Sequence, residues 1–395
     1  MHDKGGEDMV DAHADAHEET EMIDVVESFS CPAQTEAYIK AFQGWRRRER
    51  CPYAYRFHKN PKETTFSDGR AVGADTPALA QSSALRALGG LFGSVLLLYL
   101  LLENVLDKVL VLLANVLGYR VEILYWGDTR LYGDLRAVFL IAAGVDIVKY
   151  LIPALVLALF LKLPREVRFP LPVSHPQRLL DGIGLMMLLS VGFGTFFVSQ
   201  SAEMSKYRMI ADAVGAEDHR IILFILFSVF VQPFAAELLL HGSMFQVLRQ
   251  FGDRFTVCTT AVLSACLAHN VQDAVRIGVV TFLISAYVIT TGSVISAILL
   301  RVTHEIYMFA LFYIGNFGQL HSVLWWIAVV TPVLIFSVTA VLYLHRHEGR
   351  IRMPSKDTDG MSVMEQSAVF YTTLPMTVYL IVSVLFMIVT VILAS

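Results

Sequence analysis

Charged residues are scarce in this 395-residue chain: Asp, Glu, Lys and Arg together make up only 17% of it. Soluble domains carry about 25% charged residues, so the shortage excludes an ordinary soluble globular protein. Hydrophobic residues make up 55% of the chain. They gather in runs of about 20 residues, each long enough to cross a bilayer. The composition therefore predicts a polytopic membrane protein in contact with the lipid bilayer.

Cysteine is scarce as well, with four residues in the whole chain. Cys258 and Cys266 lie in an apolar run. Cys31 and Cys51 lie in a polar segment that we place in the cytoplasm, so reduced thiols are predicted rather than a disulfide framework. The net charge is −4 and no basic surface is interleaved with aromatic residues, so no nucleic-acid partner is expected.

Residues 1–83 form a hydrophilic, cytoplasmic tail, which predicts no cleavable signal peptide at the front. Residues 1–30 are acidic with scattered histidines and predict disorder; weak metal binding through His13 and His17 is the alternative. Near residues 34–49, aromatic residues recur at helical spacing before a cluster of arginines. This pattern predicts an amphipathic helix, either on an anionic membrane surface or packed against the protein's own membrane domain.

Beyond the tail, the apolar runs predict an all-α, polytopic transmembrane bundle of about nine spans. The expected helices lie near residues 87–117, 136–163, 180–199, 220–248, 255–271, 274–290, 293–315, 322–345 and 371–394. They divide into N-terminal transmembrane helices (84–219), a four-helix core (220–315) and C-terminal transmembrane helices (316–395). Basic residues in the short loops place the N-terminus in the cytoplasm and the C-terminus outside; eight or ten spans would change this orientation.

Ionisable residues inside a span are costly and usually face the bundle interior or a water-filled cavity. In the first expected helix, Glu103, Asp107 and Lys108 are close enough in sequence to pair with one another. In the second, Asp146 and Lys149 are three residues apart on one helical face. We interpret both groups as structural pairings.

A second set of ionisable residues lies in the core, and its members are Glu237, His241, His269, Arg301, His304 and Glu305. Glu237 and His241 are four residues apart, and the 301–305 group shares roughly one helical face. The sequence allows two arrangements. Either these side chains meet around one polar cavity, or they form three unrelated features: a Glu237–His241 pair, an Arg301–Glu305 pair and a capping histidine at position 269.

The order of these segments resembles the CPBP family of intramembrane proteases, which includes the CAAX prenyl endopeptidases and many bacterial relatives. "AAELLLHG" resembles the first family motif, "LSACLAHN" the second, and "AYVITTGSVISAILLRVTHE" the stretch that leads to the third. The resemblance covers about residues 220–310, and its most specific feature is Thr291-Gly292-Ser293 at the family's distance from His269. It implies a protease-like four-helix core in a membrane, here expected to be a bacterial plasma membrane, and a peptide or membrane-protein substrate.

In this family, the first Glu of motif one and the His of motif two activate a water, and polar groups of motif three stabilise the oxyanion. The resemblance leaves the cofactor open between a divalent metal such as zinc and no metal. This chain departs from the pattern. Ala236 takes the position of the first Glu, His241 that of the Arg, and Ala265 that of the Phe, whereas Glu237 and His269 match. Motif three falls on Arg301 and Glu305, with His304 one residue earlier.

Two functions follow from this comparison. The first is a divergent endopeptidase with a rearranged site, in which Glu237, His269, His304 and Glu305 are catalytic and His241 and Arg301 support them. The second is a catalytically inactive relative that binds peptides or membrane partners, as an immunity or maturation factor would. A transporter is a weaker alternative because no paired repeat with broken helices is evident. Reactive-hydroxyl chemistry is not predicted, since the nearby serines have no evident triad partner in the sequence.

Overall fold

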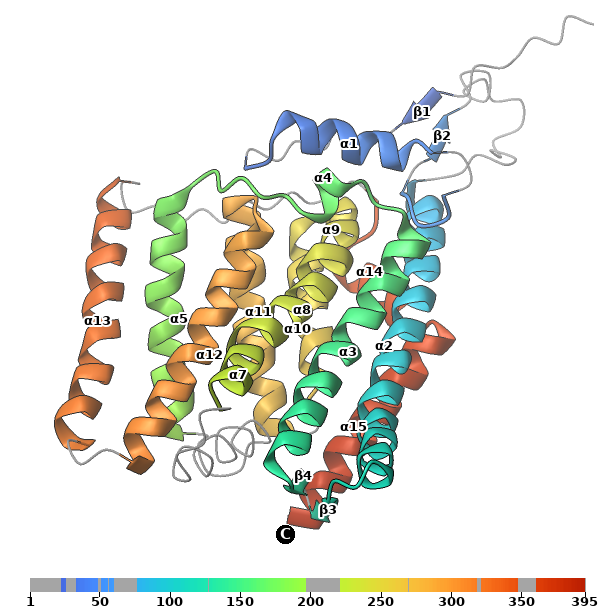
Figure 1. Cartoon of the computed structure of the whole chain (residues 1–395). Helices are drawn as coiled ribbons and strands as arrows, with labels where there is room; N and C mark the ends of the chain where they lie inside the picture. Colours follow the sequence, from blue (N-terminus) through green and yellow to red (C-terminus); the bar gives the residue numbers. More distant parts are fainter. Residues whose placement is uncertain are drawn as a thin grey trace, which may run out of the picture.

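The structure is a computed structural model, and it is mainly a bundle of α-helices (Figure 1). It describes residues 23–25, 33–48, 51–55, 57–59, 77–126, 128–196, 221–268, 270–317, 321–346 and 360–394. The helices before the core are α1 (Glu36–Arg46), α2 (Pro77–Val116), α3 (Leu135–Leu161), α4 (Arg165–Arg168) and α5 (Pro176–Phe196). Those that follow are α7 (Ile221–Leu226), α8 (Gln232–Leu239), α9 (Phe245–Leu248), α10 (Asp253–Ala265), α11 (Val271–Thr291), α12 (Val294–Phe317), α13 (His321–Arg346), α14 (Val363–Tyr371) and α15 (Leu374–Ala394).

Two short antiparallel ribbons accompany the helices. Strand β1 (Ile23–Val25) pairs with β2 (Phe57–Lys59), and β3 (Val121–Trp126) pairs with β4 (Asp128–Gly133). The β3–β4 hairpin joins α2 to α3 at the end of the bundle opposite α1 (Figure 1). The apolar runs of the sequence predict neither ribbon.

Four helical segments of the described chain are long and apolar enough to cross a membrane, judged by length and composition. They are Arg136–Leu161, Val271–Thr291, Val294–Leu311 and Leu374–Ile392. The expected count of about nine spans is not confirmed by this criterion, although helical structure is present in all nine expected regions. The chain is therefore an integral membrane protein with four candidate spans in its described part.

The region expected as one helix over 220–248 is interrupted by wider turns. Between α7 and α8 lies a π-helical turn, η2 (Phe227–Val231), and between α8 and α9 lies a second, η3 (Leu240–Met244). A short 3₁₀ turn, η4 (Arg249–Phe251), ends the segment. A π-helical turn widens the helix by one residue and often marks a functional position.

Helix α11 begins and ends with clear capping signals. The side chain of Asn270 accepts a hydrogen bond from the backbone N–H of Asp273, which caps the first turn. Gly292 ends the helix in the left-handed region with φ +71°. A Cβ at this position would also collide with the carbonyl oxygen of Ala33. Thr291-Gly292-Ser293 is therefore a tight turn that lies directly under the N-terminal segment.

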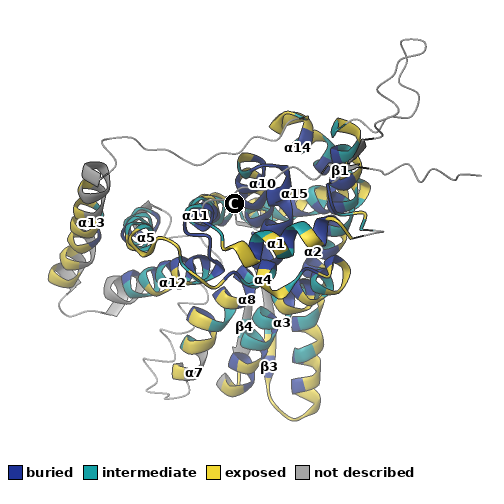
Figure 2. Ribbon diagram, turned by 90° about the horizontal axis from the view of Figure 1, so that it is seen from above, coloured by how far each residue is buried: buried dark blue, intermediate teal, exposed yellow. Residues whose placement is uncertain are grey.

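Helix α1 lies across the end of the bundle, next to α4 (Figures 1 and 2). The aromatic rings of Tyr38, Phe42 and Trp45 are fully buried. The indole N–H of Trp45 donates to the carbonyl of Leu161 at 2.7 Å. Of the two arrangements that the sequence allowed for this helix, the structure has the one in which it packs on the protein's own helices.

Two of the three hydrophobic cores in the described part of the chain surround the α8–α12 region. The first joins α1, α2, α3, the α8–α10 region, α14 and α15 through residues such as Phe92, Phe255 and Phe370. The second lies between α5, α11 and α12 and includes Met186 and Ile284. Since both cores contain residues of the α8–α12 region, its polar side chains are enclosed between well-packed layers.

The ionisable residues of α2 and α3 pair with one another. Lys149 lies 2.9 Å from Glu103 and 2.9 Å from Asp146, and its ammonium group faces the rings of Tyr99 and Tyr150. The Asp146–Lys149 contact is the i,i+3 pair that the sequence suggested. This cluster joins the two helices by satisfying charges that would be costly alone.

Candidate functional site

Glu237 and His241 form a fully buried pair on successive turns of one helix. Nδ1 of His241 contacts Oε2 of Glu237 across the i,i+4 spacing, and both residues are 0% exposed. The other carboxylate oxygen, Oε1, has no hydrogen-bond partner among the described residues. A buried carboxylate oxygen without a partner is costly, so Glu237 is a candidate for a functional role.

The second ring nitrogen of His241 faces another helix. Its Nε2 lies 2.9 Å from Oγ of Ser285 on α11. With Glu237 ionised and His241 neutral, Nδ1–H donates to the carboxylate and Nε2 accepts from the serine hydroxyl. Glu237, His241 and Ser285 therefore form a continuous chain from carboxylate to imidazole to hydroxyl.

The π-helical turn η3 places this histidine. The backbone N–H of Phe245 donates to the carbonyl of Leu240, five residues earlier, and His241 lies inside that widened turn. The ring of Phe245 packs against the imidazole with centroids 5.1 Å apart. The ring of His241 is thus fixed between Glu237 on its own helix and Ser285 on the next.

Helix α1 is connected to the same histidine through Gln246. Nε2 of Gln246 donates to the backbone carbonyl of His241 at 2.9 Å, and Oε1 of Gln246 accepts from the hydroxyl of Tyr38 at 2.8 Å. All three residues are buried. The docked N-terminal helix therefore covers the end of the site nearest to η3.

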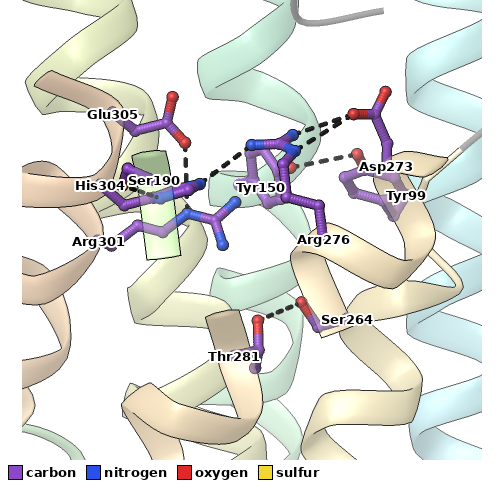
Figure 3. A network of polar contacts seen from close by, with 10 residues as sticks. All are labelled: Tyr99, Tyr150, Ser190, Ser264, Asp273, Arg276, Thr281, Arg301, His304 and Glu305. Atoms are coloured by element: carbon purple, nitrogen blue, oxygen red, sulfur yellow. Dashed lines mark hydrogen bonds and ion pairs between the residues drawn. The ribbon is translucent and has the colours of Figure 1, made fainter. Parts of the chain in front are cut away.

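His304 belongs to a second polar group (Figure 3). Its Nδ1 lies 2.8 Å from Oγ of Ser190 on α5, and its Nε2 lies 3.2 Å from a guanidinium nitrogen of Arg276 on α11. Arg276 also donates to Asp273 at 3.2 and 3.3 Å. Because a guanidinium only donates, Nε2 of His304 accepts, and the ring proton is on Nδ1. His304 therefore donates to Ser190, whose hydroxyl donates to the carbonyl of Met186 at 2.7 Å.

Arg301 and Glu305 contact each other on the same face of α12 as expected. The Nε–Oε1 distance is 3.5 Å, and both residues are buried (Figure 3). This is the i,i+4 ion pair that the sequence offered as the structural alternative. Arg301 lies about one turn before His304 and Glu305 directly follows it, so both charges lie close to the second polar group along α12.

The structure thus places the predicted site residues that it describes in two polar groups. Glu237 and His241 contact each other, and His241 also contacts Ser285, whereas Arg301 and Glu305 contact each other on α12. On α11 the two groups contact positions 285 and 276, which are about 13 Å apart along the helix axis. His269 lies outside the described residues. Its predicted catalytic role therefore stays a prediction.

Four residues of these groups were missed by sequence reasoning: Ser190, Asp273, Arg276 and Ser285. Asp273 and Arg276 carried a signal, because they are ionisable residues three apart at the start of an expected span. Ser190 and Ser285 carried none, since a serine in an apolar helix is common. The expectation that nearby serines lack a triad partner is wrong for Ser285, whose hydroxyl contacts His241.

The Thr291-Gly292-Ser293 turn has a structural role. The hydroxyl of Ser293 donates to the carbonyls of Pro170 and Leu171 at 3.0 and 2.9 Å, and the N–H of Ser174 donates to the carbonyl of Thr291 at 3.0 Å. The turn therefore fixes the start of α12 against the segment that follows α4. It positions the site without contributing to it.

The donor set in the described part of the chain does not fit a catalytic metal. Zinc in such sites takes about three protein ligands, and Glu237 with His241 offers two that bind each other. No group of three or more His, Cys, Asp or Glu residues suited to a metal is found within the described ranges.

A buried carboxylate–histidine pair inside a helical membrane domain is the kind of site that an intramembrane hydrolase would use. Residues 218–307 match the family model described as "Rce1-like: Type II CAAX prenyl endopeptidase Rce1-like". The chain therefore carries an Rce1-like domain over α7 to α12, which confirms the CPBP resemblance read from the motifs. No curated protein and no solved structure matches the chain.

One departure from the family pattern has a packing reason. Ala265, which takes the position of the motif-two Phe, faces Gly278 on α11, where an added Cβ would lie 3.2 Å from the alanine Cβ. Small residues let α10 and α11 approach closely, so an aromatic ring would not fit at position 265. Ala236, at the position of the first Glu, is buried, and nothing in the structure explains its replacement.

Proposed function

We propose that this protein is a divergent CPBP-type intramembrane endopeptidase, with its N-terminus in the cytoplasm. It hydrolyses a peptide bond in a membrane-associated protein or peptide. The observation that carries the proposal is the fully buried Glu237, which binds His241 through one carboxylate oxygen and leaves the other without a partner among the described residues.

In this proposal the Glu237–His241 pair is the general base. It accepts the proton of the attacking oxygen, holds it while the tetrahedral intermediate forms, and returns it to the leaving nitrogen. Because the pair is shielded from water, its charges act strongly on the reacting atoms. The family that the motifs resemble has a Glu at the position of Ala236, so in this proposal Glu237 takes over that role from the next position along the helix.

The second polar group supports the site in this proposal. Arg276 and His304 join α11, α12 and α5, and Arg301–Glu305 keeps two charges in the interior next to them. Glu305 and His269 remain candidate catalytic residues from the motif comparison. Their contribution is tested with the same assay.

The test uses the full-length protein in liposomes together with a library of membrane-anchored peptides, and mass spectrometry detects the products. The wild type is compared with Glu237→Gln, Glu305→Gln and His269→Ala. We expect Glu237→Gln to reduce turnover by roughly 10³-fold, as removal of a catalytic base does. Equal turnover in all four proteins would contradict the proposal.

A second function, a catalytically inactive peptide-binding relative, is favoured by one observation. Arg301 and Glu305, the motif-three positions, pair with each other as an i,i+4 ion pair. In that case peptide binding persists in Glu237→Gln, and the wild type yields no cleaved product in the liposome assay.

A further inference from the structure

The backbone carbonyl of His241 accepts a side-chain hydrogen bond inside the widened turn η3. In a regular α-helix this carbonyl would accept from the N–H of Phe245, four residues later. Here that N–H donates to the carbonyl of Leu240 instead, five residues earlier. The side-chain amide of Gln246 donates to the carbonyl of His241 at 2.9 Å. Gln246 therefore supplies, from its side chain, the hydrogen bond that the π-helical turn gives up.

Gln246 is itself held in place by the N-terminal helix α1. Its Oε1 accepts from the hydroxyl of Tyr38 at 2.8 Å, and both side chains are buried. The guanidinium of Arg249 lies over the ring of Tyr38, 6.0 Å from the ring centre, which holds the tyrosine against the bundle. A contact made by α1 therefore reaches the backbone of His241 through a single side chain.

Loss of the Gln246 amide would favour a return of η3 to regular α-helical bonding. A buried carbonyl without a donor is costly, so the carbonyl of His241 would recover the N–H of Phe245. Closing the wide turn in this way rotates the segment after it by about 100°, the angle of one helical position. The ring of Phe245, which packs on the imidazole with centroids 5.1 Å apart, would then move away. His241 would no longer be fixed between Glu237 and Ser285.

From this geometry we propose that Tyr38 and Gln246 are positioning residues: the docked helix α1 keeps η3 in its π-helical form and so keeps His241 directed at Glu237. The inference rests on the proposed function, in which this pair is the general base that activates a water. It makes the docking of α1 a condition for the chemical step. A misplacement of about 1 Å in a catalytic group can reduce the rate by roughly 10²-fold.

The kinetic test is a double-mutant cycle in liposomes with Tyr38→Phe, Gln246→Met and the double variant. Both substitutions keep the size of the side chain and remove its hydrogen bonds. We expect each single variant to lower kcat by roughly 10-fold to 10²-fold with KM unchanged, because neither residue binds the substrate. Since Tyr38 acts through Gln246, the double variant should be no slower than Gln246→Met.

Tyr55→Phe is the matched control for Tyr38→Phe. It removes another buried hydroxyl from the N-terminal segment, and it keeps the backbone N–H that donates to Gln250 at 2.7 Å. The docking of the segment through Gln250 is therefore retained, and Gln246 is not changed. We expect Tyr55→Phe to have the kcat of the wild type.

A spectroscopic measurement gives a result that does not depend on peptide cleavage. The full-length protein with ¹⁵N-labelled histidine is studied in liposomes by solid-state NMR, and the ring signals of His241 are those that disappear in His241→Gln. In the wild type we expect a protonated Nδ1 and an Nε2 that accepts a hydrogen bond. Tyr38→Phe and Gln246→Met should shift the Nε2 signal towards that of a nitrogen without this bond, and Tyr55→Phe should leave it unchanged.

The two measurements separate failure of this inference from failure of the proposed function. In a protein that cleaves peptides, a wild-type or higher kcat in Tyr38→Phe, or unchanged His241 signals, would overturn the positioning role and leave the endopeptidase in place. Additive losses of kcat in the double variant would also overturn it, because Tyr38 would then act by a route other than Gln246. Changed His241 signals in both single variants of a protein that cleaves no peptide would support the positioning role and reject the endopeptidase. Unchanged signals in such a protein would overturn both.

Discussion

Replacing Glu237 and His241 with apolar residues, singly and together, tests whether this pair serves function or stability. His241→Leu removes the proton donor and leaves an unpaired buried carboxylate, which should cost about 3–5 kcal/mol of unfolding free energy. Glu237→Met leaves the Nδ1–H group of His241 buried without an acceptor, at a cost of about 1–3 kcal/mol. Both positions are fully buried, so solvent does not reduce these costs.

The double variant Glu237→Met, His241→Leu should be at least as stable as the wild type. Replacing both members of a buried polar pair with apolar residues of similar size is often neutral or stabilising by about 1–4 kcal/mol. The hydroxyl of Ser285 can then donate to a carbonyl of its own helix, as Ser190 does. Peptidase activity, in contrast, should be lost in all three variants.

The assay is reversible unfolding of each variant in detergent micelles, analysed as a double-mutant cycle. The matched control is Ser264→Ala with Thr281→Val, which removes a 2.7 Å hydrogen bond between α10 and α11 outside the site. This control double variant should keep its activity. If the two single costs at Glu237 and His241 simply add in the double variant, or if that variant still cleaves peptides, the reasoning is refuted.

Three further predictions concern the parts that surround the site. Trp45→Ala should speed hydrogen exchange of the α1 amides by roughly 10²-fold and leave that of α11 unchanged, because a buried Trp contributes about 3–5 kcal/mol. Gly44→Ala should instead slow exchange of the α1 amides, because a methyl group at this position enters open space and Ala favours the helix. Gly292→Ala should lower the unfolding free energy by about 1–2 kcal/mol or more, measured in micelles, because φ is +71° and the Cβ meets the carbonyl of the docked N-terminal segment. Hydrogen bonds from the backbone N–H and the side chain of Ser362 lower the pKa of Glu365. The stabilisation that ionised Glu365 gives to α14 is therefore present above the ordinary Glu pKa and is lost as pH falls through the lowered pKa. Amide exchange of α14, measured against pH, should show this loss in the wild type and not in Glu365→Gln.

The helices were predictable because apolar runs and capping residues act locally. The expected region 274–290 coincides with α11 except at its start, where Asn270 caps the helix at an earlier position. The expected helix 255–271 is shorter in the structure, since α10 ends at Ala265. The β3–β4 hairpin was not predicted, because it lies in the connection between two apolar runs, where hydrophobic periodicity gives no signal.

The candidate site was predictable only where its residues are close in sequence. The Glu237–His241 and Arg301–Glu305 pairs follow from i,i+4 spacing. The contacts of Ser285 with His241 and of Arg276 with His304 join different helices, so no periodicity in the sequence announces them. Whether the predicted residues all meet around one cavity depends on His269 and remains a prediction.

The most direct measurement of the central claim is a comparison of protein termini in native membranes. Cells that express the wild type are compared with cells that express Glu237→Gln at the same level, and new N-termini within membrane proteins are identified by mass spectrometry. The account predicts a set of termini, in or next to membrane segments, that is present with the wild type and absent with Glu237→Gln. Identical termini in both membranes would contradict it.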